Sequence, residues 1–123
     1  MARAVEWTPK SGLPLWHVTL TLAGEPVPAD ELRPALECLV QERPFMLAVR
    51  YSTDRAELRY WDEAEDVDDA AALALRIWGE HRASCGLPPW RVVGVEVIDR
   101  DTVHARGADR PQTPLITAGV TPL

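Results

Sequence analysis

Strict alternation of apolar and polar residues over residues 15–23, "LWHVTLTLA", is the feature that most limits what this chain can fold into. The apolar positions are Trp16, Val18, Leu20 and Leu22, and the polar positions between them are His17, Thr19 and Thr21. Successive side chains of a β-strand point to opposite faces, so this pattern predicts a strand with one buried face and one polar face. The strand therefore needs a covering layer on its apolar side, and it presents a histidine and two threonines on the other.

Five further elements follow this strand, in the order helix, strand, strand, helix, strand. Apolar residues at helical spacing predict a helix that becomes regular near Arg33, with Pro34 in its first turn, and that stops before Pro44. Residues 45–52 and 54–63 have the pattern of two strands joined by a short turn. A second helix is expected between an Asp66 N-cap and Gly86, and a fourth strand is expected over residues 90–101.

This order predicts an α+β fold, the ferredoxin-like βαββαβ plait: a four-stranded antiparallel sheet with two helices on one face. The length of 123 residues suits one domain. We expect an extended leader over residues 1–14, the ferredoxin-like domain over 15–103, and a C-terminal arm containing Pro and Gly over 104–123. In such a plait the first strand lies between the third and the fourth.

The charge and composition of the chain exclude some classes of partner. A net charge of −6 argues against nucleic-acid binding, which depends on Lys and Arg neutralising phosphates, and against docking to an anionic membrane. The sequence contains neither an apolar run long enough for a membrane span nor the apolar core of a signal peptide, so we expect a cytoplasmic protein. The bias towards Arg over Lys, with many Ala and Pro residues, is typical of a GC-rich bacterial genome.

The sheet face that the two helices leave uncovered is the candidate functional surface. The candidate ligand or interface residues are His17, Thr19, Thr21, Arg50, Arg59, Trp61 and Glu96. Three interpretations are open: a solvated face with cross-strand charge pairs, an interface with a second copy, and a ligand or catalytic site. In the last case His17, the weak catalytic candidate, would act as acid, base or hydrogen-bond donor, with Arg50 or Arg59 holding an anionic group.

Metal and cofactor sites are not expected. Cys38 and Cys85 form neither a disulfide framework nor a closely spaced metal motif. His81 and Cys85, four residues apart on the second helix, offer two possible zinc ligands, but zinc needs at least a third and none is evident nearby in sequence. The acidic residues between 62 and 69 lack the spacing of a calcium-binding loop.

We therefore expect a self-associating binding or accessory module, a homodimer formed through the open sheet face or the C-terminal arm. The alternative is a small enzyme or small-molecule-binding protein with a pocket around His17. A further possibility is an unlike protein partner bound through residues 111–123, which include a segment able to add as an edge strand. Phosphate-binding loops and nucleophile motifs are missing from the sequence, which leaves open whether the chain is an enzyme.

Overall fold

The computed structural model describes residues 13–43, 46–108 and 119–123. Five strands and three helices follow one another in the order β1 (Leu15–Ala23), α1 (Ala29–Glu42), β2 (Met46–Ser52), β3 (Arg55–Glu63), α2 (Val67–Cys85), β4 (Arg91–Asp99), α3 (Arg100–Ala108) and β5 (Val120–Pro122). The strands form one sheet in the order β4-β1-β3-β2-β5. The fold is therefore α+β, with a five-stranded mixed sheet.

The sheet contains one more strand, and the chain one more helix, than the sequence predicts. The expected strands pair antiparallel, and β1 lies between β3 and β4 as predicted. The additional strand β5 pairs parallel with β2, and α3 follows β4 directly. Both extra elements lie in a stretch of polar, Pro and Gly residues without a repeating apolar pattern, so the sequence signal for them is weak.

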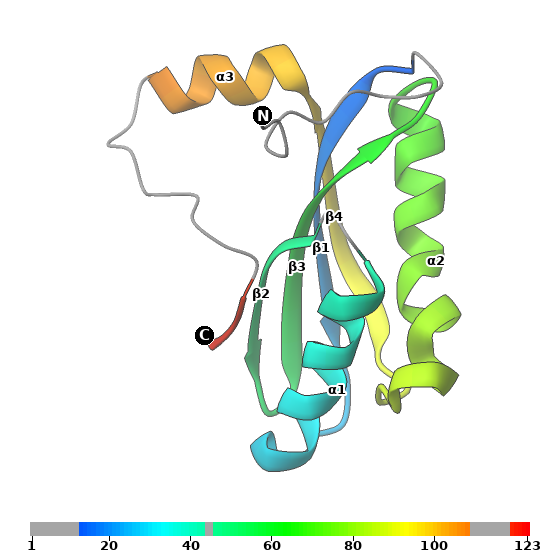
Figure 1. Ribbon diagram of the computed structural model, residues 1–123, viewed down its shortest axis with the longest axis vertical. Helices are drawn as coiled ribbons and strands as arrows, with labels where there is room; N and C mark the ends of the chain where they lie inside the picture. The colour runs from blue at the N-terminus through cyan, green and yellow to red at the C-terminus, as the bar shows by residue number, and fades with distance from the viewer. Residues whose placement is uncertain (1–12, 44–45, 109–118) are drawn as a thin grey trace.

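Two helices cover one face of the sheet, as Figure 1 shows. They lie side by side, with α1 near β2 and α2 near β1 and β4. In α2 the Asp66 side chain accepts a hydrogen bond from the backbone N–H of Asp69, and Gly86 ends the helix in the left-handed conformation at φ 71°, both as predicted. The third helix, α3, leaves the end of β4 towards the side of the sheet away from α1 and α2.

The core lies between this covered face and the two helices. Its fully buried side chains include Val18, Leu20, Leu22, Leu36, Leu39, Leu58, Tyr60 and Ile77. At one end of the core the Trp78 and Trp90 rings stack 6.0 Å apart. The alternation predicted for β1 and β3 is confirmed, because their apolar positions face α1 and α2.

Continued alternation along β4 predicts that Val93, Val95 and Val97 face the core; Val97 packs against the core, but the prediction is wrong for the other two. Val93 and Val95 are 45% and 40% exposed. A register shift between Thr21 and Leu22 places Val92, rather than Val93, opposite Leu22, and Val92 packs against the core. An extra residue in one strand of an antiparallel pair changes which side chains point inward, so alternation counted along the sequence fails beyond that point.

Helix α1 also starts earlier than predicted, at Ala29, so that Pro34 lies inside it. Pro34 has no N–H with which to continue the hydrogen bonds of the helix, and the first turns form nevertheless. Asp30 and Glu31 in the first turn complement the positive end of the helix dipole, which favours the earlier start.

Candidate functional site

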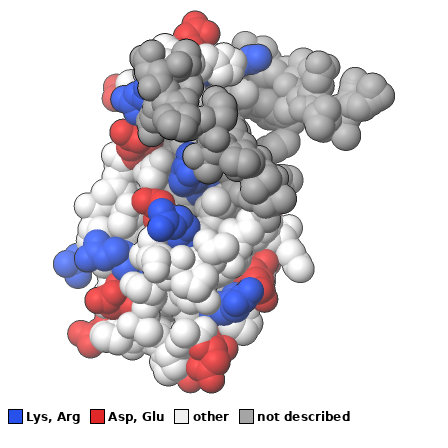
Figure 2. Space-filling view, turned by 90° about the vertical axis from the view of Figure 1, so that its left-hand side faces the viewer, with Lys and Arg blue, Asp and Glu red and all other residues white. Residues whose placement is uncertain are grey.

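The face of the sheet opposite α1 and α2, called the open face below, brings most of the predicted site residues together. His17 on β1 lies opposite Trp61 on β3 and Ile98 on β4. Two residues further on, Thr19 lies between Arg59 and Glu96. In Figure 2, which views the molecule from this side, basic and acidic side chains are interspersed among neutral ones.

His17 is buried, although neither α1 nor α2 covers its side of the sheet. The residue is only 6% exposed, and its ring meets the Trp61 ring edge-to-face at a centroid distance of 5.1 Å. Burial lowers the pKa of the imidazole from 6.5; the charge of Arg59 lowers it further, and Glu96 raises it. His17 is therefore a neutral imidazole at neutral pH.

Two buried side-chain atoms lack a hydrogen-bond partner among the described residues, Nδ1 of His17 and the hydroxyl oxygen of Tyr60. The Tyr60 side chain belongs to the core side of the sheet. Among the described residues of the open face, His17 is therefore the one with a buried side-chain nitrogen, Nδ1, that lacks a hydrogen bond. Leaving such an atom unpaired costs about 1–3 kcal/mol.

Of the other predicted residues, Arg50 and Thr21 lie further from His17, and Glu96 forms an ion pair. Arg50 lies towards the β5 edge, opposite Glu57 on β3 and Thr121 on β5, and is therefore separated from His17. Thr21 lies opposite Glu57 and Gly94, one step further along β1. The carboxylate of Glu96 is partly neutralised by Arg106 of α3, whose Nη1 lies 3.6 Å from Oε2. That contact with α3 is missing from the prediction.

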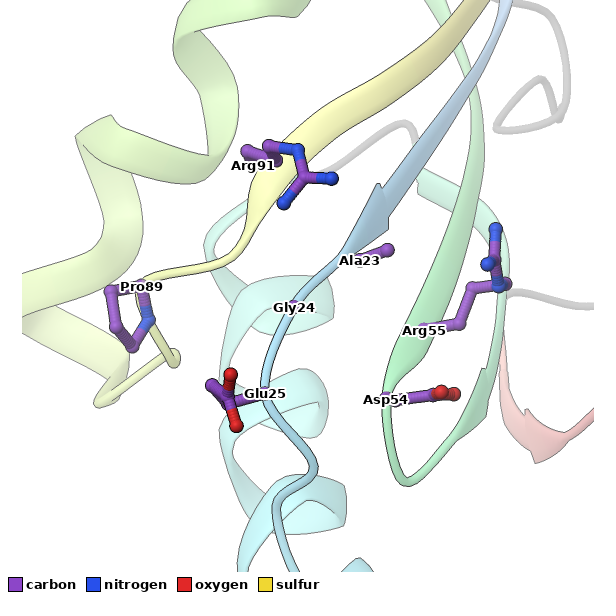
Figure 3. A pocket seen from close by; sticks show the side chains of 7 residues that line it. All are labelled: Ala23, Gly24, Glu25, Asp54, Arg55, Pro89 and Arg91. Atoms are coloured by element: carbon purple, nitrogen blue, oxygen red, sulfur yellow. The ribbon is translucent and has the colours of Figure 1, made fainter.

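A hollow of about 490 Å³ lies at the C-terminal end of β1, away from His17 (Figure 3). It is lined by Ala23, Gly24, Glu25, Asp54, Arg55, Pro89 and Arg91. Ala23 pairs with Arg55 in one ladder and with Arg91 in the other, so two guanidinium groups flank one small side chain. Sequence reasoning missed this hollow because neither arginine belongs to a motif; only the strand register brings them together.

A second group of chemically active side chains, also unpredicted, lies where α1 contacts α2. Cys38 and Cys85 form a disulfide with a Cα–Cα distance of 5.5 Å, which corrects the expectation that these two cysteines do not form a disulfide framework. Beside it, Oε1 of Glu42 lies 2.6 Å from Nδ1 of His81 and accepts a hydrogen bond of 2.8 Å from the Ser84 hydroxyl. These two hydrogen bonds lower the pKa of Glu42.

The fold and these sites define a small α+β protein with a five-stranded mixed sheet, two helices on one face and a polar open face on the other. The chain belongs to the family described as Domain of unknown function (DUF8830), whose model matches residues 15–114. Neither a curated protein nor a solved structure matches the chain. Within the described part of the chain, every helix is too short or too polar to cross a membrane.

Proposed function

We propose that the chain is a cytoplasmic, non-catalytic binding module built on a ferredoxin-like plait, and that its open face binds a small anionic molecule beside His17. The plait consists of β1 to β4 with α1 and α2, and β5 and α3 are additions to it. The observation that carries the proposal is the buried Nδ1 of His17, which has no hydrogen-bond partner among the described residues.

The neighbours of His17 favour an anionic ligand with a flat apolar part. In a neutral imidazole one ring nitrogen is a donor and the other an acceptor, and Nδ1 can take either role according to the tautomer, so a bound polar group would satisfy Nδ1. Arg59 lies diagonally across the β1–β3 ladder and has no ion-pair partner within the described ranges, which leaves a positive charge for a carboxylate or phosphate. The half-buried Trp61 ring, in contact with His17, provides an apolar surface.

The same geometry argues against catalysis by His17. A histidine that acts as a general base is normally held in one tautomer by a hydrogen bond to its second nitrogen. The carboxylate nearest in register, Glu96, lies opposite Thr19 rather than His17, and it is engaged by Arg106. Binding without a chemical step is therefore the function that the arrangement supports best.

The proposal is tested by NMR titration of the full chain with aromatic carboxylates and phosphate monoesters. We expect chemical-shift changes at the His17 ring and the Trp61 indole, and a loss of affinity of about tenfold or more in His17→Ala and in Arg59→Gln, about the value of one charge-assisted hydrogen bond. Arg50→Gln, on the same face but opposite Glu57, is the matched control and should bind as the wild type does. Equal binding by His17→Ala, or shifts confined to Arg55 and Arg91, would overturn the proposal.

Self-association is a second candidate, favoured by the free edge of β4. This strand is outermost in the sheet, no described strand pairs with its outer side, and Val93 and Val95 are exposed on it. A long apolar edge strand is a template for pairing with another chain. Residues 120–122 of the predicted arm already pair with β2 of their own chain, and residues 109–118 lie outside the described residues, so β4 is the edge we propose for a homodimer.

Light scattering over a range of concentrations tests this second candidate. We expect a dimer that Val95→Lys converts to monomer, because lysine on an edge strand opposes pairing. Leu75→Lys, at an exposed apolar position on α2, is the control and should leave the dimer intact. A wild-type chain that stays monomeric at every concentration would rule it out.

A further inference from the structure

We propose that Cys38, Glu42 and Cys85 form a redox-gated zinc site at the contact between α1 and α2. In the oxidised protein the disulfide closes the site. Reduction to two thiols opens it to one Zn²⁺ ion, with His81 and Ser84 holding the Glu42 carboxylate in place. The site lies on the covered side of the sheet, so it is independent of the proposed ligand site at His17.

The geometry rests on two matching pairs of side chains. Cys38 and Glu42 are four residues apart on α1, and His81 and Cys85 are four residues apart on α2, so each pair lies on one face of its helix. The two faces meet, because the two cysteines are joined as a disulfide and the Glu42 and His81 side chains lie 2.6 Å apart. Four side chains with metal-ligating atoms therefore converge between two helices.

The separations suit a tetrahedral metal. The ligand atoms of Cys38, Glu42 and Cys85 all lie within 4.8 Å of one another. Zinc–sulfur bonds of about 2.3 Å and zinc–oxygen bonds of about 2.0–2.2 Å place tetrahedral ligand atoms roughly 3.4–3.8 Å apart. Once the S–S bond is broken, modest side-chain rotation therefore brings the three atoms to these separations, without movement of the helices.

The donor set selects the metal, and the surrounding hydrogen bonds orient the donors. Two thiolates favour zinc over the harder magnesium and calcium ions, and a carboxylate is an accepted third zinc ligand. His81 and Ser84 both bond to Oε1 of Glu42, which leaves the second carboxylate oxygen for the metal. Partners of this kind commonly orient the ligands of a metal site. The fourth zinc position is filled by water.

The redox step balances with a dithiol as the reductant. The dithiol transfers two electrons and two protons to the disulfide and becomes a cyclic disulfide itself, while Cys38 and Cys85 become thiols. Zinc then displaces the two thiol protons into solvent and binds the resulting thiolates and the Glu42 carboxylate. Thiol–disulfide exchange with a small-molecule disulfide reverses the sequence: the external disulfide accepts two electrons from the thiolates and two protons from solvent and becomes two thiols, the Cys38–Cys85 bond re-forms, and the ion is released.

Accessibility and polarity distinguish this cluster from a plain structural crosslink. Both cysteines are half-buried, and the His81 and Glu42 side chains retain 17% and 34% of their exposure, so a reductant and an ion can reach them. A crosslink that only fastens two helices requires no carboxylate, imidazole and hydroxyl beside it. The cytoplasmic location proposed above, on which this point alone rests, also favours a redox-active disulfide over a permanent one.

The test is cobalt and zinc binding to the full-length chain, oxidised and after reduction by excess dithiothreitol followed by its removal under anaerobic conditions. Co²⁺ reports thiolate ligation through charge-transfer absorption, and Zn²⁺ affinity is measured by competition with a chromophoric chelator. We expect the reduced protein to bind one ion per chain with thiolate-to-cobalt absorption, and the oxidised protein to bind none at this site.

Variants assign the ligands. Cys38→Ser should abolish the charge-transfer band of a dithiolate site, and His81→Ala should weaken zinc binding by about 10–100-fold, as expected for a residue that orients a ligand. Glu80→Gln, at an exposed position on the same helix, is the control and should bind as the wild type does. Circular dichroism follows folding in each sample, and a reduced chain that folds only with zinc also supports the site.

Three outcomes overturn the proposal. The first is a disulfide that persists in excess dithiothreitol. The second is reduced wild-type protein, folded or unfolded, that binds zinc no more tightly than the Cys38→Ser/Cys85→Ser double variant. The third is equal binding by the oxidised and reduced proteins, which would place the metal elsewhere on the chain.

Discussion

Gly24, at the exit of β1, is a position where the absence of a side chain determines local packing. A Cβ at Gly24 would overlap the Trp90 ring, whose indole N–H donates a 2.8 Å hydrogen bond to the carbonyl oxygen of Glu25. We therefore predict that Gly24→Ala lowers the free energy of unfolding by about 1–3 kcal/mol, the usual cost of overpacking. Gly79 in α2 has open space where a methyl group would lie, and Gly79→Ala should instead stabilise the protein by about 0.5–1 kcal/mol. Urea denaturation measures both changes, and two effects of the same sign would contradict this account.

Burial of His17 makes the stability of the protein depend on pH. Burial and the charge of Arg59 lower the pKa of His17 below 6.5, despite the opposing effect of Glu96. As the pH falls, His17 is therefore protonated in the unfolded chain before it is protonated in the folded chain. The unfolded state then binds more protons, so the free energy of unfolding falls as the pH drops below 6.5 towards the folded-state pKa.

We predict that His17→Gln, which cannot titrate, removes this part of the pH dependence. Urea denaturation of wild type and variant over about pH 5 to 8 measures it. The difference in unfolding free energy between the two proteins should change with pH in this window, in favour of the variant at the acid end. Curves that stay parallel would show that His17 is protonated equally in both states.

At the scale of elements, β5 protects one edge of the sheet. Its pairing with β2 includes hydrogen bonds from the N–H of Val49 to the carbonyl of Gly119, at 2.7 Å, and from the N–H of Leu123 to the carbonyl of Tyr51, at 2.6 Å. We predict that deleting residues 119–123 accelerates amide hydrogen exchange at Val49, while amides shared by β1 and β3 keep their protection. Unchanged exchange at Val49 would show that β5 does not pair stably in solution.

The elements that could be predicted from the sequence are those with strong periodic patterns. Alternation in β1 and β3, and the Asp66 and Gly86 caps of α2, depend on short-range geometry that the residues themselves express. The outward turn of Val93 depends on a bulge, and β5 forms only because β2 offers it an edge. These features arise from pairing between distant segments, which leaves little trace in either segment alone.

The candidate sites follow the same division. Periodicity was enough to place His17, Thr19, Arg59 and Glu96 on one face, because a sheet face is a property of alternation. The α1–α2 cluster was beyond prediction, since Cys38 and Cys85 are separated by 47 residues and meet only through helix packing. The matching four-residue spacings on the two helices were present in the sequence, but nothing local indicated that they face each other.

At the scale of the whole molecule, the disulfide closes a loop that contains β2, β3 and all of α2, which ends at Cys85. A crosslink across 47 residues restricts the unfolded chain, and we predict that the Cys38→Ser/Cys85→Ser variant is about 2–4 kcal/mol less stable than the oxidised wild type. Urea denaturation with both proteins free of metal measures the difference. Equal stability would show that strain or residual structure in the unfolded state cancels the entropic gain.

The two edge strands of the sheet, β5 and β4, differ in how readily they can pair with a strand of another chain, and this difference limits how many chains can join. On one side the short β5, which contains Pro122, is a poor template for another strand, whereas on the other side the nine-residue β4 has no described neighbour on its outer side. A chain with one competent edge can join only one other chain through it, so pairing by β4 terminates after a single event. Pairing through β4, as proposed above, would therefore give a closed, two-fold pair rather than the endless stacking that two open edges would permit.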